Sequence, residues 1–358
     1  MRKAVVIVTL IGVQSLGSAV EIKPVIDAKL LGGQNYYNAS EGNLGAVMSL
    51  NAAPYMQFND KWSLVPLYAG HYQGTKQVTD IVGGGTPLRD SQDHTLSAKV
   101  IRSFPNDLKV KAVAGYGIEL LRETKDEGWT KGLYDNRRIF TGTEAEWSWK
   151  KDNSVRLAYD YYRIRFPNYQ SLESAQVNNG LGREFNQPDV LDNGNHVFSL
   201  STRVVLPGQG LLDASASYTR REYGDQHLVL ETGSLDPETR HDSAQSVSLT
   251  GTWPVMNRTN KKLFTSVGYA WTHLYSDQNH YDANQVFFNP NFYAYVTQSI
   301  TNQWTLLLGP EEKTWTLNFN TSVARQSYSD RFTQDFPYSF LVSEKDLMSK
   351  LVGCQSVQ

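Results

Sequence analysis

The sequence predicts an all-β protein, a transmembrane up-and-down antiparallel β-barrel of about 14 strands. Three observations predict this fold class: an apolar segment near the N-terminus with the pattern of an export signal, long segments that alternate between apolar and polar residues, and short connections that alternate with long ones. The alternation alone would also fit a water-soluble sheet. The fold class is therefore predicted by the three observations together.

The first 19 residues have the three parts of a secretory signal peptide. Arg2 and Lys3 form a positive start, an apolar run covers 4–13, and small Gly17 and Ala19 precede an expected cleavage before Val20. The alternative is a membrane anchor, but a helix that spans a bilayer needs about 20 apolar residues. We therefore expect residues 1–19 to be a signal peptide that is removed on export.

The composition of the remaining chain narrows the possible partners. Removing Arg2 and Lys3 lowers the formal net charge from −2 to −4, which argues against a nucleic-acid partner. Cys354 is the single cysteine, so an internal disulfide is excluded. The mean hydropathy is −0.44 although the chain has 20 Tyr, 14 Phe and 8 Trp. A polar average with many aromatics is expected where strands expose apolar residues on one face only.

The clearest alternating segment is Leu108–Leu120. Its even positions are apolar, whereas its odd positions include Lys109, Lys111 and Glu119 together with glycine. Globular strands are commonly about 5–6 residues long, but a tilted membrane strand needs about 9–11. A segment of this length therefore favours a membrane strand. The same alternation recurs at 154–161, 212–219, 246–255 and 314–323.

Short connections rich in turn-forming residues alternate with long ones. The short ones are 59–61, 105–107, 150–153, 207–210, 257–262 and 310–313, and the long ones are about 74–92, 122–137, 167–195, 223–244, 276–291 and 328–336. Short periplasmic turns opposite long extracellular loops are typical of outer-membrane barrels, so both termini are expected on the periplasmic side. The segment 292–309 fits either one overlong strand or two short ones, and two would break the even count.

Aromatic residues lie near both ends of the expected strands. Tryptophans lie near the short turns and tyrosines near the long loops, as membrane-interface girdles require. The predicted interface residues are Trp62, Trp147, Trp149, Trp253, Trp304, Tyr72, Tyr161, Tyr218 and Tyr275. The alternative is a soluble barrel or sandwich with an aromatic core. That fold would need a second layer to cover the apolar faces, and no helical pattern supplies one.

With these features the chain resembles the outer-membrane β-barrels of Gram-negative bacteria over residues 20–342. The resemblance implies a location in the outer membrane, contact with its lipid and lipopolysaccharide, and insertion by the barrel assembly machinery. Such barrels usually close on an aromatic terminal residue. Here the last strand is expected to begin at Tyr338, Phe340 and Val342, and residues 343–358 are expected to form a C-terminal tail of uncertain structure.

Charged residues at inward positions are the candidate functional residues. They are Lys109, Lys111, Glu119, Glu144, Glu146, Arg156 and Asp160, and they are expected to face one another across neighbouring strands. One interpretation is a wall of fixed charge that selects solutes, and the other is a structural network inside a polar barrel. Because 8-stranded barrels are filled and 16–18-stranded porins hold an aqueous channel, we expect a pore or facilitated-diffusion channel for small polar solutes. No enzymatic activity and no cofactor are expected.

Two other functions remain open. One is a secretion or assembly partner that accepts a polysaccharide or protein from a periplasmic export component. The other is a lipid-modifying enzyme, because His241 and Ser243 share one strand face. This pair weakly resembles the His-x-Ser of outer-membrane phospholipase A, which implies Ser243 as nucleophile and His241 as general base. That family has Asn and Gly after the serine, whereas Ala244 and Gln245 stand here, so no catalytic residue is assigned.

Metal binding has little support in the sequence. The seven histidines include no pair with metal-site spacing, and no metal site is predicted. Acidic residues in the expected loop 223–244 allow two interpretations, a solvated loop or ligands for divalent cations that bridge lipopolysaccharide. They are Asp236, Glu238 and Asp242.

Overall fold

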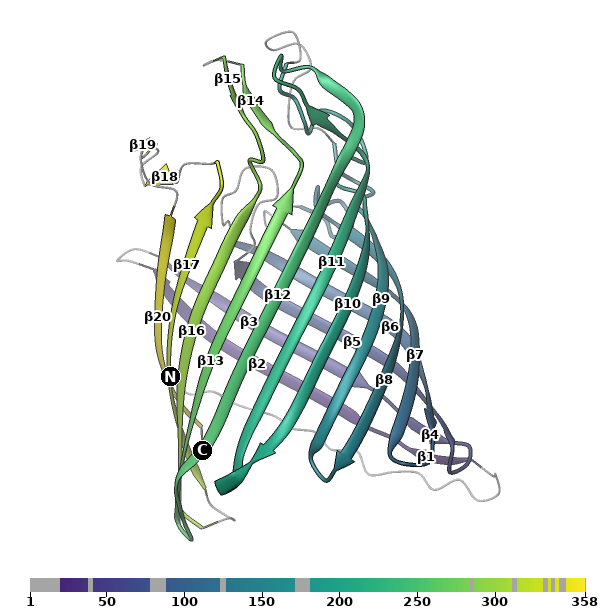
Figure 1. Cartoon of the computed structure of the whole chain (residues 1–358), viewed down its shortest axis with the longest axis vertical. Coiled ribbons are helices and arrows are strands. Elements are labelled where there is room, and N and C mark those ends of the chain that lie inside the picture. The colour runs from purple at the N-terminus through teal and green to yellow at the C-terminus, as the bar shows by residue number, and fades with distance from the viewer. Residues whose placement is uncertain are drawn as a thin grey trace.

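The computed structural model describes residues 20–37, 41–77, 88–122, 127–170, 181–283, 286–310, 314–330, 334–335, 339–340 and 346–357. The predicted signal peptide, 1–19, lies outside the described residues. The described chain forms one antiparallel sheet of 16 strands, and neighbouring strands follow one another along the chain (Figure 1). The up-and-down order predicted from the sequence is therefore confirmed.

Fourteen strands of this sheet have 12 residues or more. They are β2 (Ile26–Tyr37), β3 (Glu41–Ala52), β5 (Trp62–Gln77), β6 (Leu88–Ser103), β7 (Leu108–Arg122), β8 (Asn136–Lys150), β9 (Asn153–Arg165), β10 (Asn193–Leu206), β11 (Gly210–Val229), β12 (Leu235–Arg258), β13 (Lys261–Ser276), β16 (Tyr295–Leu308), β17 (Trp315–Tyr328) and β20 (Asp346–Val357). The other elements are short: β1 (Glu21–Lys23), β4 (Tyr55–Gln57), β14 (His280–Asp282), β15 (Phe287–Asn289), β18 (Gln334–Asp335), β19 (Ser339–Phe340) and the 3-10 turn η2 (Pro207–Gln209).

The first hairpin of the sheet is interrupted by proline. Pro24 separates β1 from β2 and Pro54 separates β3 from β4, yet β1 pairs with β4 just as β2 pairs with β3. Proline has no N–H to donate to a ladder. The backbone N–H of Ala53 still donates to Val25 O at 2.8 Å, so each pair continues the same hairpin beyond its break.

The short turns use backbone conformations that reverse a strand tightly. Asn106 and Asp107 have φ of 64° and 57°, and Asp152 has φ of 67°. Left-handed φ matches the twist of two-residue hairpin turns, and Asn and Asp tolerate it better than most residues. The turn-forming residues therefore reverse the chain at 105–107 and 150–153, as predicted.

The ends of some strands differ from the prediction. The expected loop 223–244 is mostly strand, because β11 runs to Val229, β12 starts at Leu235 and only 230–234 connect them. The segment 292–309 contains one strand, β16, so the even count of long strands holds. A last strand is expected from the sequence to begin at Tyr338, Phe340 and Val342. Tyr338 and Val342 lie outside the described residues, and Ser339–Phe340 pairs with Gln334–Asp335 in a separate two-stranded sheet, not with the main sheet.

The last strand of the main sheet instead lies in the segment expected to be a tail. β20 pairs with β17 over twelve positions, from Ser327↔Asp346 to Thr316↔Val357. Its sequence alternates poorly, with Lys350 between Leu347 and Leu351, and this weak alternation explains why the sequence pattern missed it.

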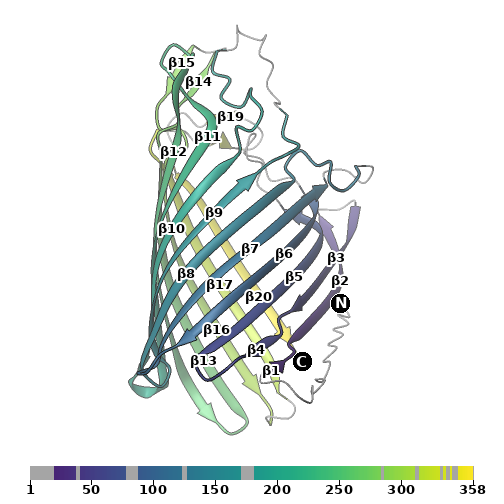
Figure 2. The same ribbon diagram turned by 90° about the vertical axis from the view of Figure 1, so that its right-hand side faces the viewer.

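The sheet has two faces of opposite character. One face carries large apolar side chains that are highly exposed, such as Leu96 (63%), Ile139 (65%) and Ile300 (60%). The other face carries the charged and hydroxyl residues of the same strands. In a membrane barrel the apolar face is the outer one and the polar face lines the interior. Figures 1 and 2 show the strands inclined in two facing walls, with β2 and β3 behind β12 and β13 in the first view and β5–β9 in front of β16, β17 and β20 in the second.

The predicted interface aromatics lie on the strands of this sheet. Seven of the nine are exposed, namely Trp62, Trp147, Trp149, Trp253, Trp304, Tyr218 and Tyr275. Tyr72 and Tyr161 are half-buried. The rings of Tyr72 and Trp129 are T-shaped to one another, and the ring centres of Tyr161 and His196 lie 5.0 Å apart. Their role at a membrane interface stays a prediction.

No helix among the described residues is long and apolar enough to cross a membrane. Within the described part of the chain no ladder joins β20 to β1 or β2, so these strands are the two edges of the sheet. The fold class is an all-β, up-and-down antiparallel barrel sheet of 14 long strands.

Candidate functional site: the inner wall and its mouth

A ladder of ion pairs lies on the inner face of β7–β9. The Lys111 ammonium lies 2.6 Å from Glu144 Oε1 and 2.5 Å from Glu146 Oε2, and all three side chains are mostly buried. Arg156 on β9 lies 3.7 Å from the other oxygen of Glu144. The register explains these contacts, because Lys111 faces Glu144 across β7–β8 and Glu146 faces Arg156 across β8–β9.

The structure places the other predicted lumen residues on the same face. Lys109 is the direct partner of Glu146 across β7–β8. The amide of Asn136 donates to Glu119 Oε2 at 3.0 Å. Asp160 lies over Gly142, where a Cβ would overlap its carboxylate, so glycine makes room for the charge. Whether these residues act on a solute stays a prediction.

The row of ion pairs continues along the inner wall to β11 through residues that were not predicted from the sequence. Arg156 Nε donates to Ser201 Oγ at 3.1 Å. Arg203 Nε donates to Asp213 Oδ1 at 2.7 Å, and the two residues are direct partners across β10–β11. Arg203 and Asp213 are the same kind of cross-strand pair as the predicted ones, so the alternation contained the signal.

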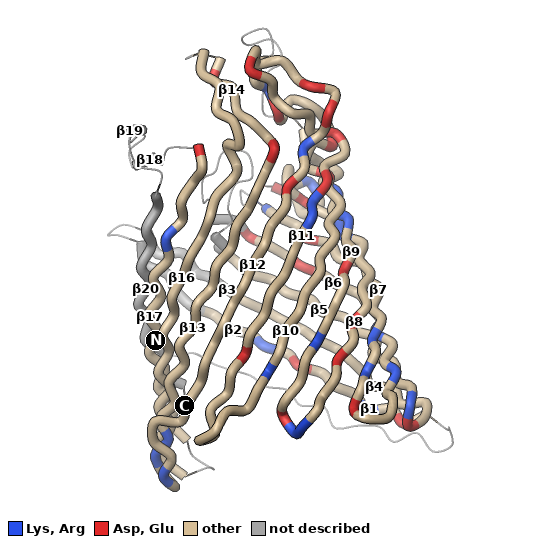
Figure 3. Tube along the Cα trace, in the orientation of Figure 1, with Lys and Arg blue, Asp and Glu red and all other residues tan. Residues whose placement is uncertain are grey.

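The opposite part of the wall, formed by β12, β13, β16 and β17, is polar and, away from the strand ends, uncharged. The stretches 243–257, 263–276, 295–308 and 315–324 contain no Lys, Arg, Asp or Glu. Figure 3 shows the middle of β13, β16 and β17 free of charged positions, whereas such positions recur along β7, β8 and β9. Hydroxyl and amide groups pair across the strands instead: Ser246–Thr272 at 3.0 Å, Thr252–Ser266 at 2.7 Å and Thr305–Asn318 at 2.8 Å.

An arginine is buried at the loop end of the inner wall. The Arg240 guanidinium donates to both carboxylate oxygens of Asp242, at 2.8 and 2.9 Å. It also lies over the rings of Tyr223 and Tyr293, at 4.8 and 4.4 Å from the ring centres. A planar guanidinium suits both the two-point ion pair and the aromatic stack. Arg240 therefore ties β12 to β11 and to the connection that carries Tyr293.

The same tyrosine holds a buried carboxylate. The Tyr293 hydroxyl donates to Glu184 Oε1 at 2.7 Å, and His280 Nδ1 lies 3.4 Å from that oxygen. Glu184 is 4% exposed, and its Oε2 has no hydrogen-bond partner among the described residues. The Tyr293–Glu184 bond joins 181–192 to 286–294, so we call it the latch.

Loops form an apolar core above the inner wall. We name residues 127–135, 166–170, 181–192 and 286–294 the loop cap. Its buried cluster packs around two residues whose strand positions face inward, Leu121 of β7 and, half-buried, Ile164 of β9. The loop members are Tyr134, Phe166, Tyr169, Phe185, Val190 and Leu191. The loop cap therefore lies against the mouth of the interior and on the charged side of it.

One carboxylate anchors the loop cap to β7, and a second joins two segments of the cap. Asp135 Oδ1 accepts from Leu121 N at 2.7 Å, and Asp192 Oδ1 accepts from Phe166 N at 2.8 Å. Burial raises the pKa of both carboxyl groups, and the backbone donors oppose that shift in part. Two buried backbone N–H groups, those of Leu121 and Phe166, are thus satisfied by side chains of the cap.

The His-x-Ser pair lies on the other face. His241 and Ser243 alternate with Arg240 and Asp242, so they face outward with Leu249. Asp277 Oδ1 accepts from His241 N at 2.8 Å, and its Oδ2 lies 3.6 Å from His241 Nδ1. Burial raises the pKa of Asp277, against the opposing effect of the His241 N–H. The carboxylate beside the histidine comes from the connection after β13.

The structure also assigns Asp242 differently from the sequence reading. Asp242 is 3% exposed and pairs with Arg240, so it is not a loop ligand for cations that bridge lipopolysaccharide. In the described part of the chain no group of three or more His, Cys, Asp or Glu residues is arranged to hold a metal ion. The Arg-x-Asp spacing of Arg240 and Asp242 could have predicted this inward-facing ion pair at the mouth, because the two residues share the strand face opposite His241 and Ser243.

Comparisons with known proteins add little detail. No family model matches the chain, and no curated protein matches its sequence. Among solved structures the chain is similar to OmpT, an outer membrane protein of Vibrio cholerae in its trimer form. The identity is 9%, the TM-score is 0.38, and the match covers 94% of this chain and 100% of that one. A TM-score this low carries no argument.

The architecture itself assigns the class. Fourteen long antiparallel strands, an apolar outer face and a polar inner face are the features of β-barrels in the outer membrane of Gram-negative bacteria. The predicted outer-membrane β-barrel class and outer-membrane location stand on these features.

Proposed function

We propose that the chain is a pore or facilitated-diffusion channel for small polar solutes in the outer membrane, without catalytic activity. The observation that carries the proposal is the inner wall. Paired charges line β7–β11, and uncharged hydroxyl and amide groups line β12–β17. A wall of satisfied polar groups lets a hydrated solute exchange hydrogen bonds with the protein along its path.

The division of the wall favours solutes that are polar and carry no net charge. A hydroxyl-rich solute meets donors and acceptors on the neutral side. On the other side, the lysine–glutamate and arginine–aspartate pairs present both signs of charge at short spacing. A singly charged solute meets charges of both signs there, so attraction and repulsion nearly cancel and it gains little binding energy. The loop cap narrows entry on the charged side.

A planar-bilayer recording of the purified protein tests this proposal. We expect discrete conductance steps, and vesicles containing the protein should admit uncharged sugars faster than sugar acids of similar size. Absence of conductance above the lipid background, where a known porin conducts, would contradict the pore function. The rival role as a secretion or assembly partner would then be tested by capture of a periplasmic export component.

A second function, a lipid-modifying hydrolase, is favoured by one observation. Asp277 lies beside His241 on the outer face, where Ser243 is two residues away along β12. The arrangement would make Ser243 the nucleophile, with His241 as its base and Asp277 as the group that orients the histidine. Release of fatty acid from phospholipid vesicles, abolished by Ser243→Ala, would support it. Equal rates for both proteins would remove it.

A further inference from the structure

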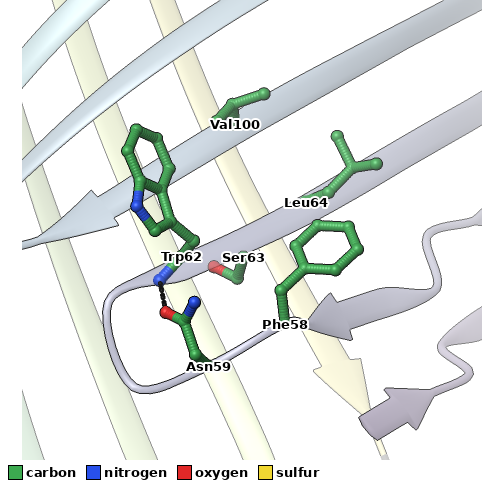
Figure 4. A pocket seen from close by; sticks show the side chains of 6 residues that line it. All are labelled: Phe58, Asn59, Trp62, Ser63, Leu64 and Val100. Atoms are coloured by element: carbon green, nitrogen blue, oxygen red, sulfur yellow. Dashed lines mark hydrogen bonds between the residues drawn. The ribbon is translucent and has the colours of Figure 1, made fainter. Parts of the chain in front are cut away.

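The outer face has a pocket near the short-turn end of β5 and β6. Its volume is about 410 Å³, and it is lined by Phe58, Asn59, Trp62, Ser63, Leu64 and Val100. Figure 4 shows Trp62 on one side and Phe58 and Leu64 on the other, with Val100 above them. Pockets that hold small ligands commonly measure about 300–1,000 Å³.

The turn before β5 shapes this pocket. Asn59 Oδ1 accepts from the backbone N–H groups of Lys61 and Trp62, at 2.9 and 3.0 Å. The N–H of Phe58 donates to Trp62 O at 3.1 Å. These bonds hold the backbone that carries Phe58 and Trp62, and 46% and 40% of the two residues remain exposed.

A cation stands at the rim of the pocket. Arg102 is the direct partner of Trp62 across β5–β6, so both side chains lie on the outer face. Its guanidinium lies 5.0 Å from the Trp62 ring centre and 4.6 Å from that of Phe104. Among the described residues no carboxylate lies within ion-pair distance of Arg102. The Arg102 guanidinium therefore lies on the outer face, over two aromatic rings, without a carboxylate of the described chain to balance its charge.

We propose that this pocket binds one phospholipid of the periplasmic leaflet. An acyl chain occupies the space between Phe58, Trp62, Leu64 and Val100, and the phosphate group pairs with Arg102. The occupant follows from charge complementarity, since an exposed guanidinium at the membrane interface recruits the phosphate that the protein does not supply. The short-turn side is the periplasmic side, where the leaflet consists of phospholipid.

Native mass spectrometry of the detergent-purified barrel, titrated with phosphatidylglycerol, tests the proposal. We expect one tightly held lipid, and a diacylglycerol without phosphate should bind about tenfold more weakly because it loses the charge-assisted contact. Arg102→Gln should weaken phosphatidylglycerol binding to the same degree. Val100→Trp should remove the tight site by filling the pocket.

Val110→Trp is the matched control. Val110 is the β7 partner of Arg102, faces outward and does not line the pocket. Equal binding by Val100→Trp and Val110→Trp, or unchanged binding by Arg102→Gln, would overturn the proposal. If Val100→Trp fails to fold, Phe58→Ala tests the same wall from a turn. None of these substitutions reaches the interior, so the conductance should stay unchanged. The lipid site can therefore be confirmed or refuted independently of the pore function.

Discussion

Replacing Lys111 by glutamine should make the pore select for cations. The ladder residues Lys109, Lys111 and Arg156 balance Glu144, Glu146 and Asp160, and the substitution leaves one uncompensated negative charge. A unit charge about 10 Å from a passing ion contributes about 0.4 kcal/mol in water. That energy favours cations about twofold and disfavours anions about twofold, so the permeability ratio should rise about fourfold at low salt.

The reversal potential across a bilayer with a potassium chloride gradient measures this ratio. Lys111→Arg should leave it unchanged, because the charge is kept. The double variant Lys111→Gln, Glu146→Gln restores the balance and should return the ratio to that of the parent. Ser248→Ala, on the uncharged wall, is the control for substitution as such. An unchanged ratio in Lys111→Gln at low salt would refute the argument that the ladder faces the ion path.

Three further predictions concern the loop cap. Tyr293→Phe removes the latch to Glu184, a hydrogen bond to a charged group worth about 1.5–3 kcal/mol. Protease cleavage within the cap should therefore become faster while the strands stay resistant. An unchanged cleavage rate would contradict a role of the latch in holding the cap. Gly182→Ala should loosen the same segment, because Gly182 has φ of 69° and a Cβ would overlap the carbonyl oxygen of Tyr281; a cap with parental hydrogen exchange would argue against this. Burial raises the pKa of Asp192, so protonation of this carboxyl group favours the packed cap, and the stability of the cap should rise as pH falls from neutral towards about 4. Hydrogen exchange corrected for intrinsic rates measures this stability, and Asp192→Asn should flatten its pH dependence. Steady loosening of the cap over that pH range would contradict the prediction.

The sequence pattern predicted the walls of the barrel well. In β7 every second residue faces inward, so the alternation placed Lys109, Lys111 and Glu119 on one face and their register partners could be anticipated. A period of two is imposed by a membrane on one side and water on the other. It therefore reports directly on the strands that have both surroundings.

The pattern failed where that asymmetry ends. The loop-side parts of β11 and β12 carry charged and polar residues on both faces, so 223–244 looked like a loop. The Arg240–Asp242 pair belongs to this stretch and was missed with it. In the cap, the residues that form the core come from connections without periodicity, such as Tyr134, Phe185 and Val190. Tertiary contacts alone bring them together.

The accessibility of Ser248 and Leu249 tests the central account most directly. The two are neighbours on β12, but Ser248 faces inward, with its hydroxyl 2.8 Å from that of Ser215, and Leu249 faces outward and is 46% exposed. Each is replaced by cysteine in a Cys354→Ser background, and a membrane-impermeant thiol reagent is added to protein in vesicles. We predict modification of Ser248→Cys with loss of conductance, and no modification of Leu249→Cys. Equal modification at both positions, or none at Ser248→Cys, would contradict a water-filled interior behind a lipid-facing wall.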